Sequence, residues 1–498
     1  LIPEKKRPFV HLKIGRLLLQ NRDQSRLTDD IFEILNHFVF SLQLIENHDE
    51  KIRIAELCLI AGRKAKDSTS YDLGVHFLTM AKNLLGKSGW EENYELTYNV
   101  LFELGECEYL NDNPTIAELY FKEILGYSKT RFEKLKVYYV HSSLYLKIGN
   151  TSESLRLGLE AAKLYNIRFP KNKTAIQVAA LLTLSKYLFL FSTKYKNPES
   201  LFNLKDCNDE EIIVLNKFLI DLATSAYQQD QNLMMLVIFK IIELYIRHGF
   251  TDASGWGFSG FSVVVLSALK MQKRGFNLWD LTVKLHQMTH SPLIKWRLSY
   301  TVLCFYNPWR IPLRDGTDNI LETIKACILN GDQIFTGYSV AMYIRTRFTS
   351  GENLKEIIET SGDHLSLIKN IPGGMDQIES VFQLIKALNG QTIGGSLNDK
   401  SFNGESTLAR LNKEGNFTKL AFFHTSRCTL FYFFGYFKEA IEESQILLNY
   451  SASFLGEQFE ALLAFYTSLS ISAYYNNPNV SKKDRKSTRL NSSHGIIS

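Results

Sequence analysis

The distribution of proline is the feature that most limits how this chain can fold. Its 498 residues contain only ten prolines, and three long stretches have none: between Pro8 and Pro114, between Pro114 and Pro170, and between Pro198 and Pro292. Proline inside a helix costs roughly 3 kcal/mol. Because apolar residues recur three and four positions apart in these stretches, while strand-like alternation is rare, the pattern predicts α-helices. We therefore expect an all-α fold.

Short polar segments recur where the predicted helices should end. Four of them join two helical patterns through a few small or polar residues: YLNDNPTIAELY (109–120), KIGNTSESLRL (147–157), TSGENLKEIIE (349–359) and FFGYFKEAIEE (433–443). A turn signal that returns between similar helical patterns indicates internal repeats.

Small residues mark the positions where paired helices should cross. We align the repeats on four small residues, called anchors. Three further positions are compared in each repeat. They lie twelve residues before the anchor, five residues before it in the turn, and seven residues after it. The anchors are Gly74, Ala117, Ser154 and Ala440; the earlier set is Gly62, Gly105, Ser142 and Cys428; the later set is Ala81, Ile124, Ala161 and Leu447; the turn set is Thr69, Asp112, Gly149 and Gly435. Helices approach to about 8–10 Å when their crossing residues are small, and such turns favour residues that tolerate a left-handed backbone.

This pattern predicts a tetratricopeptide-like superhelical array of antiparallel helix hairpins, an α-solenoid. The first three anchors are spaced more widely than the standard repeat of about 34 residues. We therefore expect hairpins with extended or irregular helices.

Composition and cysteine usage favour a soluble cytoplasmic protein. The chain is 45% hydrophobic and 22% charged. Its six cysteines are far apart, without the spacing of a zinc site or a dense disulfide framework: Cys58, Cys107, Cys207, Cys304, Cys327 and Cys428. The sequence does not begin with Met and has no recognisable signal peptide, and we expect it to be part of a longer protein.

Neither membranes nor nucleic acids are expected partners. A long apolar stretch, LMMLVIFKIIELYI (233–246), is interrupted by Lys240 and Glu243 and is too short to span a bilayer. Most of the net charge of +5 comes from Lys482, Lys483, Arg485, Lys486 and Arg489 against Asp484. The rest of the chain is close to neutral, which does not suggest a nucleic-acid surface.

Several segments resemble the helical-repeat region of large multidomain bacterial-type sensor kinases. They are FVHLKIGRLLL (9–19), IFEILNHFVFSLQLIEN (31–47), IRIAELCLIAGRKAKDSTSYDLGVHFLTMAKNLL (52–85) and FTSGENLKEIIE (348–359), and the resemblance runs along residues 9–475. It implies a serine/threonine kinase-like domain and an ATPase of the AAA/STAND type before the helical region, with a GAF sensor domain and a histidine kinase module after it. ATP would then bind elsewhere in the parent protein.

The resemblance and the repeat pattern together suggest a domain organisation. The final segment, DRKSTRLNSSHGIIS (484–498), resembles translated sequencing-adapter sequence; a genuine basic tail is the alternative. The predicted parts are 1–50, a helical lead-in from an upstream ATPase region; 51–170, tetratricopeptide-like hairpins; 171–388, irregular helical repeats; 389–412, a loop; 413–480, C-terminal tetratricopeptide-like hairpins; and 481–498, a disordered or artefactual tail.

One motif raises the alternative of a nucleotide-dependent enzyme. Residues 255–260, GWGFSG, have the Gly-x-Gly-x-x-Gly spacing of a dinucleotide loop, and Asp280 stands where an acidic residue could bind the ribose. Such a loop must follow a short buried strand, whereas residues 232–249 have the length of a helix and end in a helix stop signal at Gly249. We expect these glycines to allow close helix packing.

Two other motifs have structural alternatives. LLGKSG (84–89) contains the end of a phosphate loop, but Ala81 stands where the first glycine is required, so we expect a helix end capped at Gly86. His286 and His290 could share a metal on one helix face, yet Gln287 replaces the glutamate of a zinc protease and no third ligand is evident. We predict no catalytic, cofactor-binding or metal-binding residues in this chain.

Two groups of aromatic residues could bind partners on a concave face or fill the core between repeats. The early group is Tyr94, Tyr98, Tyr109, Tyr120, Tyr138, Tyr139 and Tyr145, and the late group is Phe431, Tyr432, Phe433, Phe434, Tyr436 and Phe437. The function that we expect is a noncatalytic scaffold that couples the flanking ATPase, GAF and kinase domains, with a free-standing protein- or peptide-binding module as the alternative.

Overall fold

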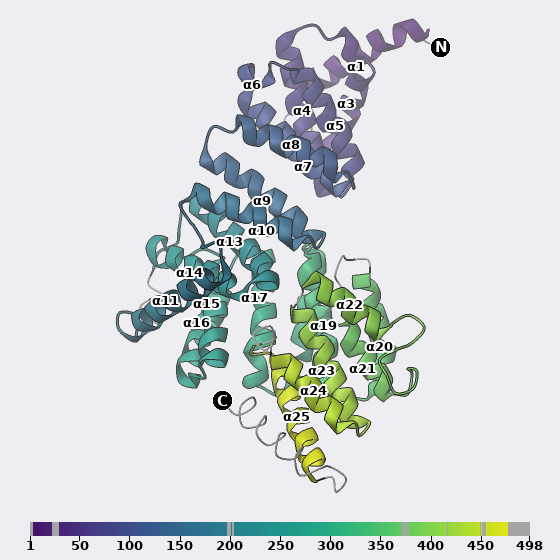
Figure 1. Cartoon of the computed structure of the whole chain (residues 1–498). Coiled ribbons are helices and arrows are strands. Elements are labelled where there is room, and N and C mark those ends of the chain that lie inside the picture. The colour runs from purple at the N-terminus through teal and green to yellow at the C-terminus, as the bar shows by residue number, and fades with distance from the viewer. Residues whose placement is uncertain are drawn as a thin grey trace. The chain divides into compact units, whose positions relative to one another are not determined.

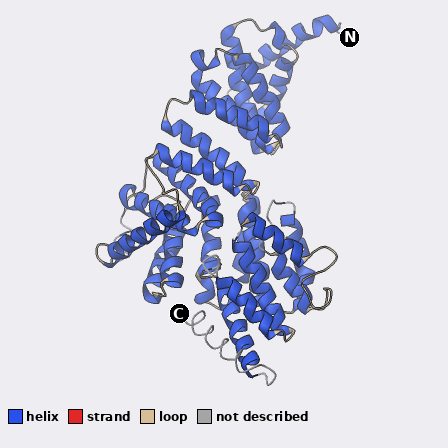
Figure 2. Ribbon diagram, in the orientation of Figure 1, coloured by secondary structure: helices blue, strands red, loops and turns tan. Residues whose placement is uncertain are grey.

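The structure is a computed structural model, and most of its described residues are helical (Figure 2). They contain no β-strand; an isolated parallel bridge joins Asp206 to Phe250. The prediction of an all-α fold is confirmed. The predicted tail 481–498 lies outside the described residues, which are 3–21, 29–196, 201, 204–369, 371, 375, 378–415, 417–448, 450 and 455–476.

The chain divides into two compact units, Leu1–Leu144 and Tyr145–Ser498, whose helices are labelled in Figure 1. Within the first unit, consecutive helices pack against each other, α4 on α5 and α7 on α8, and α5 also packs on α7. Its described elements are η1 (Glu4–Lys6), α1 (Arg7–Gln20), α3 (Ile31–Val39), η2 (Leu42–Leu44), α4 (His48–Asp67), α5 (Tyr71–Leu85), α6 (Gly89–Glu92), α7 (Tyr94–Leu110) and α8 (Pro114–Tyr127), and α9 (Arg131–Lys147) crosses the boundary in sequence.

The second unit is also built from helices that pack on their neighbours, such as α13 on α14, α18 on α19 and α23 on α24. Its described elements are α10 (Thr151–Leu164), α11 (Lys173–Ser192), α13 (Glu210–Gln229), α14 (Gln231–His248), α15 (Ser254–Val263), the π-helix η3 (Val264–Ala268), α16 (Gln272–Met288), α17 (Pro292–Phe305), η4 (Asn307–Trp309), η5 (Leu313–Gly316), α18 (Thr317–Leu329), α19 (Gln333–Thr349), α20 (Leu354–Lys369), α21 (Glu379–Leu388), α22 (Gly404–Glu414), α23 (Phe417–Phe433), α24 (Phe437–Leu447) and α25 (Gln458–Asn476).

Polar caps explain where several helices begin. The side chain of Asn47 accepts a hydrogen bond from the Glu50 backbone N–H at the start of α4. Asp230 accepts from the N–H groups of Asn232 and Leu233 at the start of α14. These oxygens satisfy N–H groups that have no partner within the helix.

The small positions of the predicted repeats are buried, and their turns are left-handed. All four turn residues have positive φ: Thr69 at 58°, Asp112 at 65°, Gly149 at 77° and Gly435 at 79°. The buried anchor, earlier and later positions are Gly62, Gly74, Ala81, Gly105, Ala117, Ile124, Ser142, Ser154, Ala161, Cys428, Ala440 and Leu447. The left-handed turns are therefore confirmed at all four aligned turn positions, and the other aligned positions are buried.

Close approach explains the small residues in the first unit. A Cβ atom on Gly62 would lie 2.5 Å from Leu78 Cγ, and one on Gly105 would lie 2.9 Å from the Phe121 ring. Leu78 and Phe121 are fully buried in the core of this unit. These glycines let α4 pack on α5 and α7 pack on α8 without displacing core side chains.

A buried ion cluster connects three helices of the second unit. Arg297 of α17 donates to Asp332 at 2.6 Å through Nε and to Asp221 of α13 at 2.7 Å through Nη1. Asp332 also accepts from the Phe335 backbone N–H and so caps α19. One guanidinium therefore fixes α17 against α13 and the start of α19.

The Gly- and Ser-rich loop 389–403 is organised around Asp399. Its carboxylate accepts hydrogen bonds from Lys386 at 2.9 Å, Gln383 at 3.2 Å, and the backbone N–H groups of Ser401 and Phe402. Although burial raises the pKa of Asp399, the Lys386 and Ser401 hydrogen bonds hold it well below its usual range. The loop is therefore anchored to the end of α21, although many of its residues are exposed.

All six cysteines are buried as free thiols. Burial raises the pKa of Cys107, Cys327 and Cys428 to about 12. A thiol in such surroundings is present as the unreactive protonated form at neutral pH.

Candidate functional site

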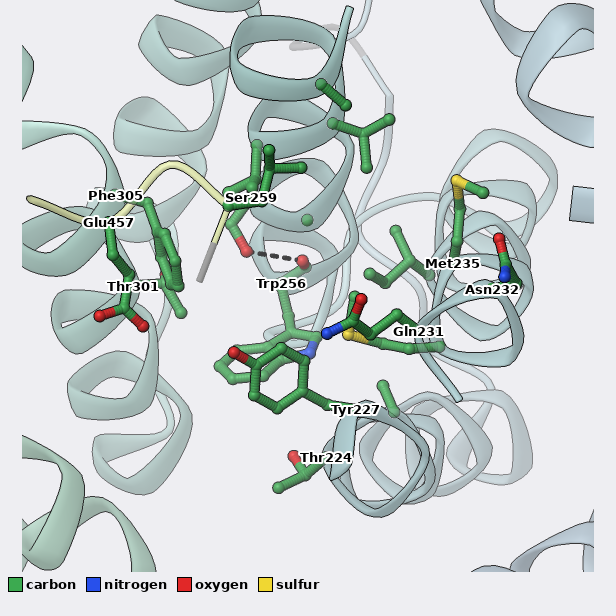
Figure 3. Close-up of a pocket in the computed structure, with 18 of the residues that line it drawn as sticks. Thr224, Tyr227, Gln231, Asn232, Met235, Trp256, Ser259, Thr301, Phe305 and Glu457 are labelled. Atoms are coloured by element: carbon green, nitrogen blue, oxygen red, sulfur yellow. Dashed lines mark hydrogen bonds between the residues drawn. The ribbon is translucent and has the colours of Figure 1, made fainter. Parts of the chain in front are cut away.

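A cavity of about 400 Å³ lies inside the second unit. Side chains from α11, α13, α14, α15, α17, α19 and α23 line it, together with η3 and the two residues Leu455 and Glu457 just before α25. In Figure 3, Thr301, Phe305 and Glu457 lie to the left of the cavity and Met235 and Asn232 to the right. The site thus collects residues that are far apart in the sequence.

Helix α15 forms one wall, and its small residues set its position. A Cβ atom on Gly255 would come within 2.5 Å of Leu298 Cδ2 on α17, and one on Gly257 within 2.9 Å of Ile241 Cγ2 on α14. A Cβ atom on Gly260 would overlap Ile238. This packing turns Trp256 and Ser259 toward the cavity, where both contribute to the wall.

The π-helix η3 continues the wall beyond α15. Its first residue, Val264, and its last, Ala268, both line the cavity, as do the flanking Val263 and Leu269. π-Helical turns are rare and occur frequently at functional sites. The wider turn allows side chains on both sides of the bulge to reach the same space.

Aromatic rings from α15, α17 and α19 form another part of the wall. Phe335 meets Tyr300 at a centroid distance of 5.5 Å, Tyr338 at 5.5 Å and Trp256 at 5.7 Å, in edge-to-face arrangements. Such contacts stabilise aromatic clusters by about 0.5–1.5 kcal/mol per pair beyond burial. The rings therefore make a firm apolar surface that can pack against a flat or branched ligand.

Several polar groups on the walls are already satisfied by the protein. Ser259 Oγ donates to the Trp256 carbonyl at 2.7 Å, a bond drawn in Figure 3. Thr301 Oγ1 donates to the Leu298 carbonyl at 2.8 Å, and Thr224 Oγ1 to the Ile220 carbonyl at 2.9 Å. Because these hydroxyls are already hydrogen-bonded to backbone carbonyls, they add little polarity to the cavity wall.

Glu457 provides a charged group at the wall. Its carboxylate accepts a hydrogen bond from Arg345 Nη2 at 3.3 Å, and both side chains are buried. Arg345 lies 4.4 Å from the Phe422 ring centroid and 5.9 Å from that of Phe459, and its Nε and Nη1 have no hydrogen-bond partner among the described residues. Burial raises the pKa of Glu457, and the nearby Arg345 guanidinium opposes that rise.

The cavity has the chemistry of a binding site. Its wall is mainly apolar, with Glu457 held in an ion pair. Among the residues that the structure describes, no group of three or more His, Cys, Asp and Glu side chains is arranged to hold a metal ion.

The structure places the predicted dinucleotide motif inside a helix. GWGFSG lies within α15, and the long helix α14 precedes it. A phosphate-binding loop instead needs free backbone N–H groups between a strand and a helix. The dinucleotide-loop alternative is therefore wrong, and the predicted close packing of its glycines is confirmed.

The other two motifs also resolve into local structure. Gly86 ends α5 with φ of 63°, and its N–H donates to the Lys82 carbonyl, as the capping prediction requires. His286 shares a 2.8 Å hydrogen bond with Ser299. His290 lies beyond the end of α16 at Met288, so the expectation that both histidines occupy one helix face is wrong.

The two aromatic groups differ in their surroundings. Tyr98 and Tyr109 are buried and donate to the backbone carbonyls of Glu133 and Leu144, which fits a role in the core. In the late group, Phe433 is 51% exposed, and Phe434 and Tyr436 are also exposed. Phe433 still contacts the Tyr466 ring at a centroid distance of 5.3 Å, so the late group is partly packed and partly exposed.

One helix among the described residues is long and apolar enough to cross a membrane by length and composition, namely α11. The apolar stretch 233–246 falls instead in α14, and half of the residues of this helix are buried. A core helix of a soluble protein can pass the same test, so the prediction of no membrane insertion stays a prediction.

The cavity itself was missed by reasoning from the sequence. Its wall contains Leu181 and Glu457, which are far apart along the chain, and no local pattern connects them. The sequence did contain one indication of the cavity. In GWGFSG a large tryptophan has only small residues as sequence neighbours, and these cannot fill the space around it.

Comparisons with known proteins give a partial likeness. A scan of protein-family models finds no match. The chain is 31% identical over 133 residues to hybrid signal transduction histidine kinase G of Dictyostelium discoideum. This likeness covers 22% of the chain and 4% of that protein. The chain is thus similar to a small part of a signal-transduction kinase.

Proposed function

We propose that this chain is a noncatalytic, tetratricopeptide-like helical-repeat region that couples an ATPase and a sensor-kinase module within a larger signal-transduction kinase. The observation that carries the proposal is the repeated hairpin pattern, in which left-handed turns precede buried small residues at a constant spacing. The partial likeness to a hybrid signal transduction histidine kinase supports the signalling context.

The mechanism that we propose is mechanical. In a stack of helical hairpins each repeat contacts its neighbours, so a change in curvature at one end alters the packing along the stack. A ligand or partner that prefers one curvature would then shift the kinase between activity states.

The test is a deletion in the full-length kinase. Removing residues 94–165 takes out α7 to α10, and we expect basal kinase activity to remain while its response to the stimulus is lost. The matched control is Leu119→Ser, because Leu119 is 62% exposed on α8. An unchanged response in the deletion variant would contradict the proposal.

A free-standing protein- or peptide-binding module is the second candidate. The exposed aromatic side chains Phe433, Phe434 and Tyr436 favour it, because aromatic residues are enriched at binding hot spots. Capture of a partner by the isolated chain that is lost in Phe433→Ser and Tyr436→Ser would support this function over the coupling role.

A further inference from the structure

We propose that the cavity beside α15 is a receptor site for an uncharged amphiphilic small molecule with an apolar body and one hydrogen-bonding end. This inference goes beyond the proposed coupling function, which requires no ligand in this unit. The two can fail separately, because the deletion 94–165 removes no residue that lines the cavity.

The size and lining of the cavity fit a small apolar ligand. Its volume of about 400 Å³ falls within the range of roughly 300–1,000 Å³ that is typical of small-molecule sites. Met234 and Met235 form a deformable part of the wall, since methionine adapts easily to the shape of its neighbours. Protein interiors are normally close-packed, so an apolar space of this size gains contacts when a ligand fills it.

The charge of the wall selects against ions. Glu457 is the charged residue among the described residues that line the cavity, and Arg345 pairs with it. The pair is neutral as a unit, so an anionic or cationic ligand would enter an apolar space without a free counter-charge. Burial of an uncompensated charge is far less favourable than burial of a neutral polar group.

The hydrogen-bonding end of the ligand has partners at the lower side of Figure 3. The amide of Gln231 points toward the rings of Trp256 and Tyr227 there. This amide offers both a donor and an acceptor. A hydroxyl or carbonyl group on the ligand can therefore be satisfied at this side of the cavity while the apolar body contacts the methionines.

The exposed face of α11 gives an apolar approach to the cavity. Leu181 lines the cavity and is 53% exposed, and its neighbours on the same helix, Val178 and Leu182, are 51% and 68% exposed. Residues three and four positions apart share one side of a helix. An apolar ligand can thus contact α11 before it enters.

The test uses the whole chain and the neutral fluorescent probe N-phenyl-1-naphthylamine. We expect saturable binding of one probe per chain, with displacement by 1-decanol. Decanoate and decyltrimethylammonium at pH 7 should displace the probe at least about tenfold less effectively, because each carries a charge into the cavity. Absence of saturable binding, or equal displacement by the charged and uncharged competitors, would overturn the proposal.

Two variants locate the probe. Val264→Phe fills the cavity from η3 and should weaken probe binding at least about tenfold, whereas Leu119→Phe, at an exposed position on α8 of the first unit, should bind as the parent chain does. Ala223→Leu fills the cavity from α13 and replaces Val264→Phe if that variant does not fold, as judged by circular dichroism. A folded filled variant with unchanged binding, or loss of binding in Leu119→Phe alone, would contradict the site. If neither filled variant folds, the competitor selectivity of the parent chain decides.

Discussion

Gly260 of α15 lies so close to Ile238 of α14 that a methyl group on its Cα would overlap the Ile238 side chain. Gly260→Ala should therefore lower the free energy of unfolding, because overpacking costs about 1–3 kcal/mol and outweighs the gain of about 1 kcal/mol in helix propensity. Chemical denaturation measures the difference.

Gly362 is the matched control for this change. It lies in the middle of α20, and a Cβ atom at this position would have nothing within 4 Å, so Gly362→Ala should stabilise the protein by up to about 1 kcal/mol. The two substitutions are chemically identical and should have opposite signs. If Gly260→Ala is as stable as Gly362→Ala, the close packing of α14 and α15 is wrong.

Replacing one partner of the buried ion pair of Arg345 and Glu457 should strongly destabilise the protein. Arg345→Met leaves a buried carboxylate unpaired and should destabilise the protein by about 3–5 kcal/mol, whereas the double variant Arg345→Met, Glu457→Met should lose less. Urea denaturation of the parent, both single variants and the double variant gives the coupling energy. Additive losses would mean that the two side chains act independently.

The same pair predicts a pH dependence. Burial raises the pKa of Glu457, so the contribution of this carboxyl group to stability is fully present below its unfolded pKa, about 4.3, and is lost as pH rises through the folded pKa. When Arg345 is removed, the charged form of Glu457 becomes even less favourable than it is in the parent protein. The stability deficit of Arg345→Met should therefore be smaller at pH 4 than at pH 7, and a deficit that grows on acidification would contradict this assignment.

Asp399 should show the opposite pH dependence. Its folded pKa is lowered, so its contribution to stability is present above the unfolded value of about 3.9 and is lost as pH falls toward the folded value. Asp399→Asn should cost about 1.5–3 kcal/mol at pH 7, as expected for hydrogen bonds to a charged group, and less at pH 3. Asp363→Asn, on the exposed side of α20, is the control and should change stability little at either pH.

In the left-handed turns, thermal stability should increase when glycine is introduced and decrease when glycine is replaced. Thr69 has φ of 58° and Gly435 has φ of 79°, and this region costs a residue with a Cβ about 1–2 kcal/mol. Thr69→Gly should therefore raise the thermal midpoint and Gly435→Thr should lower it. Because nothing lies within 4 Å of a Cβ at Gly435, a loss there reports backbone strain alone, and an unchanged midpoint would remove that explanation.

Local physics made much of the fold predictable. The stop at Gly86, the turn at Gly149 and the buried position of Gly105 all follow from backbone freedom or from the space between two neighbouring helices, and the structure has each of them. These features depend on residues that are close in the sequence. At such short range the spacing of small and turn-forming residues determines where a helix ends and where two neighbouring helices cross.

The candidate site depends on contacts that no local pattern encodes. Arg345 stands in the segment MYIRTRFTS, where a basic residue is typical of an exposed helix face, yet it is only 1% exposed because Glu457 and Phe422 enclose it. The π-helical turn at Val264 likewise follows from the packing of α15 and has no glycine or proline signal of its own. Sequence reasoning assigned the glycines of α15 to close packing, as the structure has them, but did not predict the cavity beside them.

The buried cysteines give the molecule a set of internal reporters. Cys58 and Cys107 belong to the first unit, and Cys207, Cys304, Cys327 and Cys428 to the second. A disulfide reagent can modify a buried thiol only when its surroundings open. The labelling rate at each position, read by mass spectrometry, would therefore time the opening of each unit separately and without any engineered label.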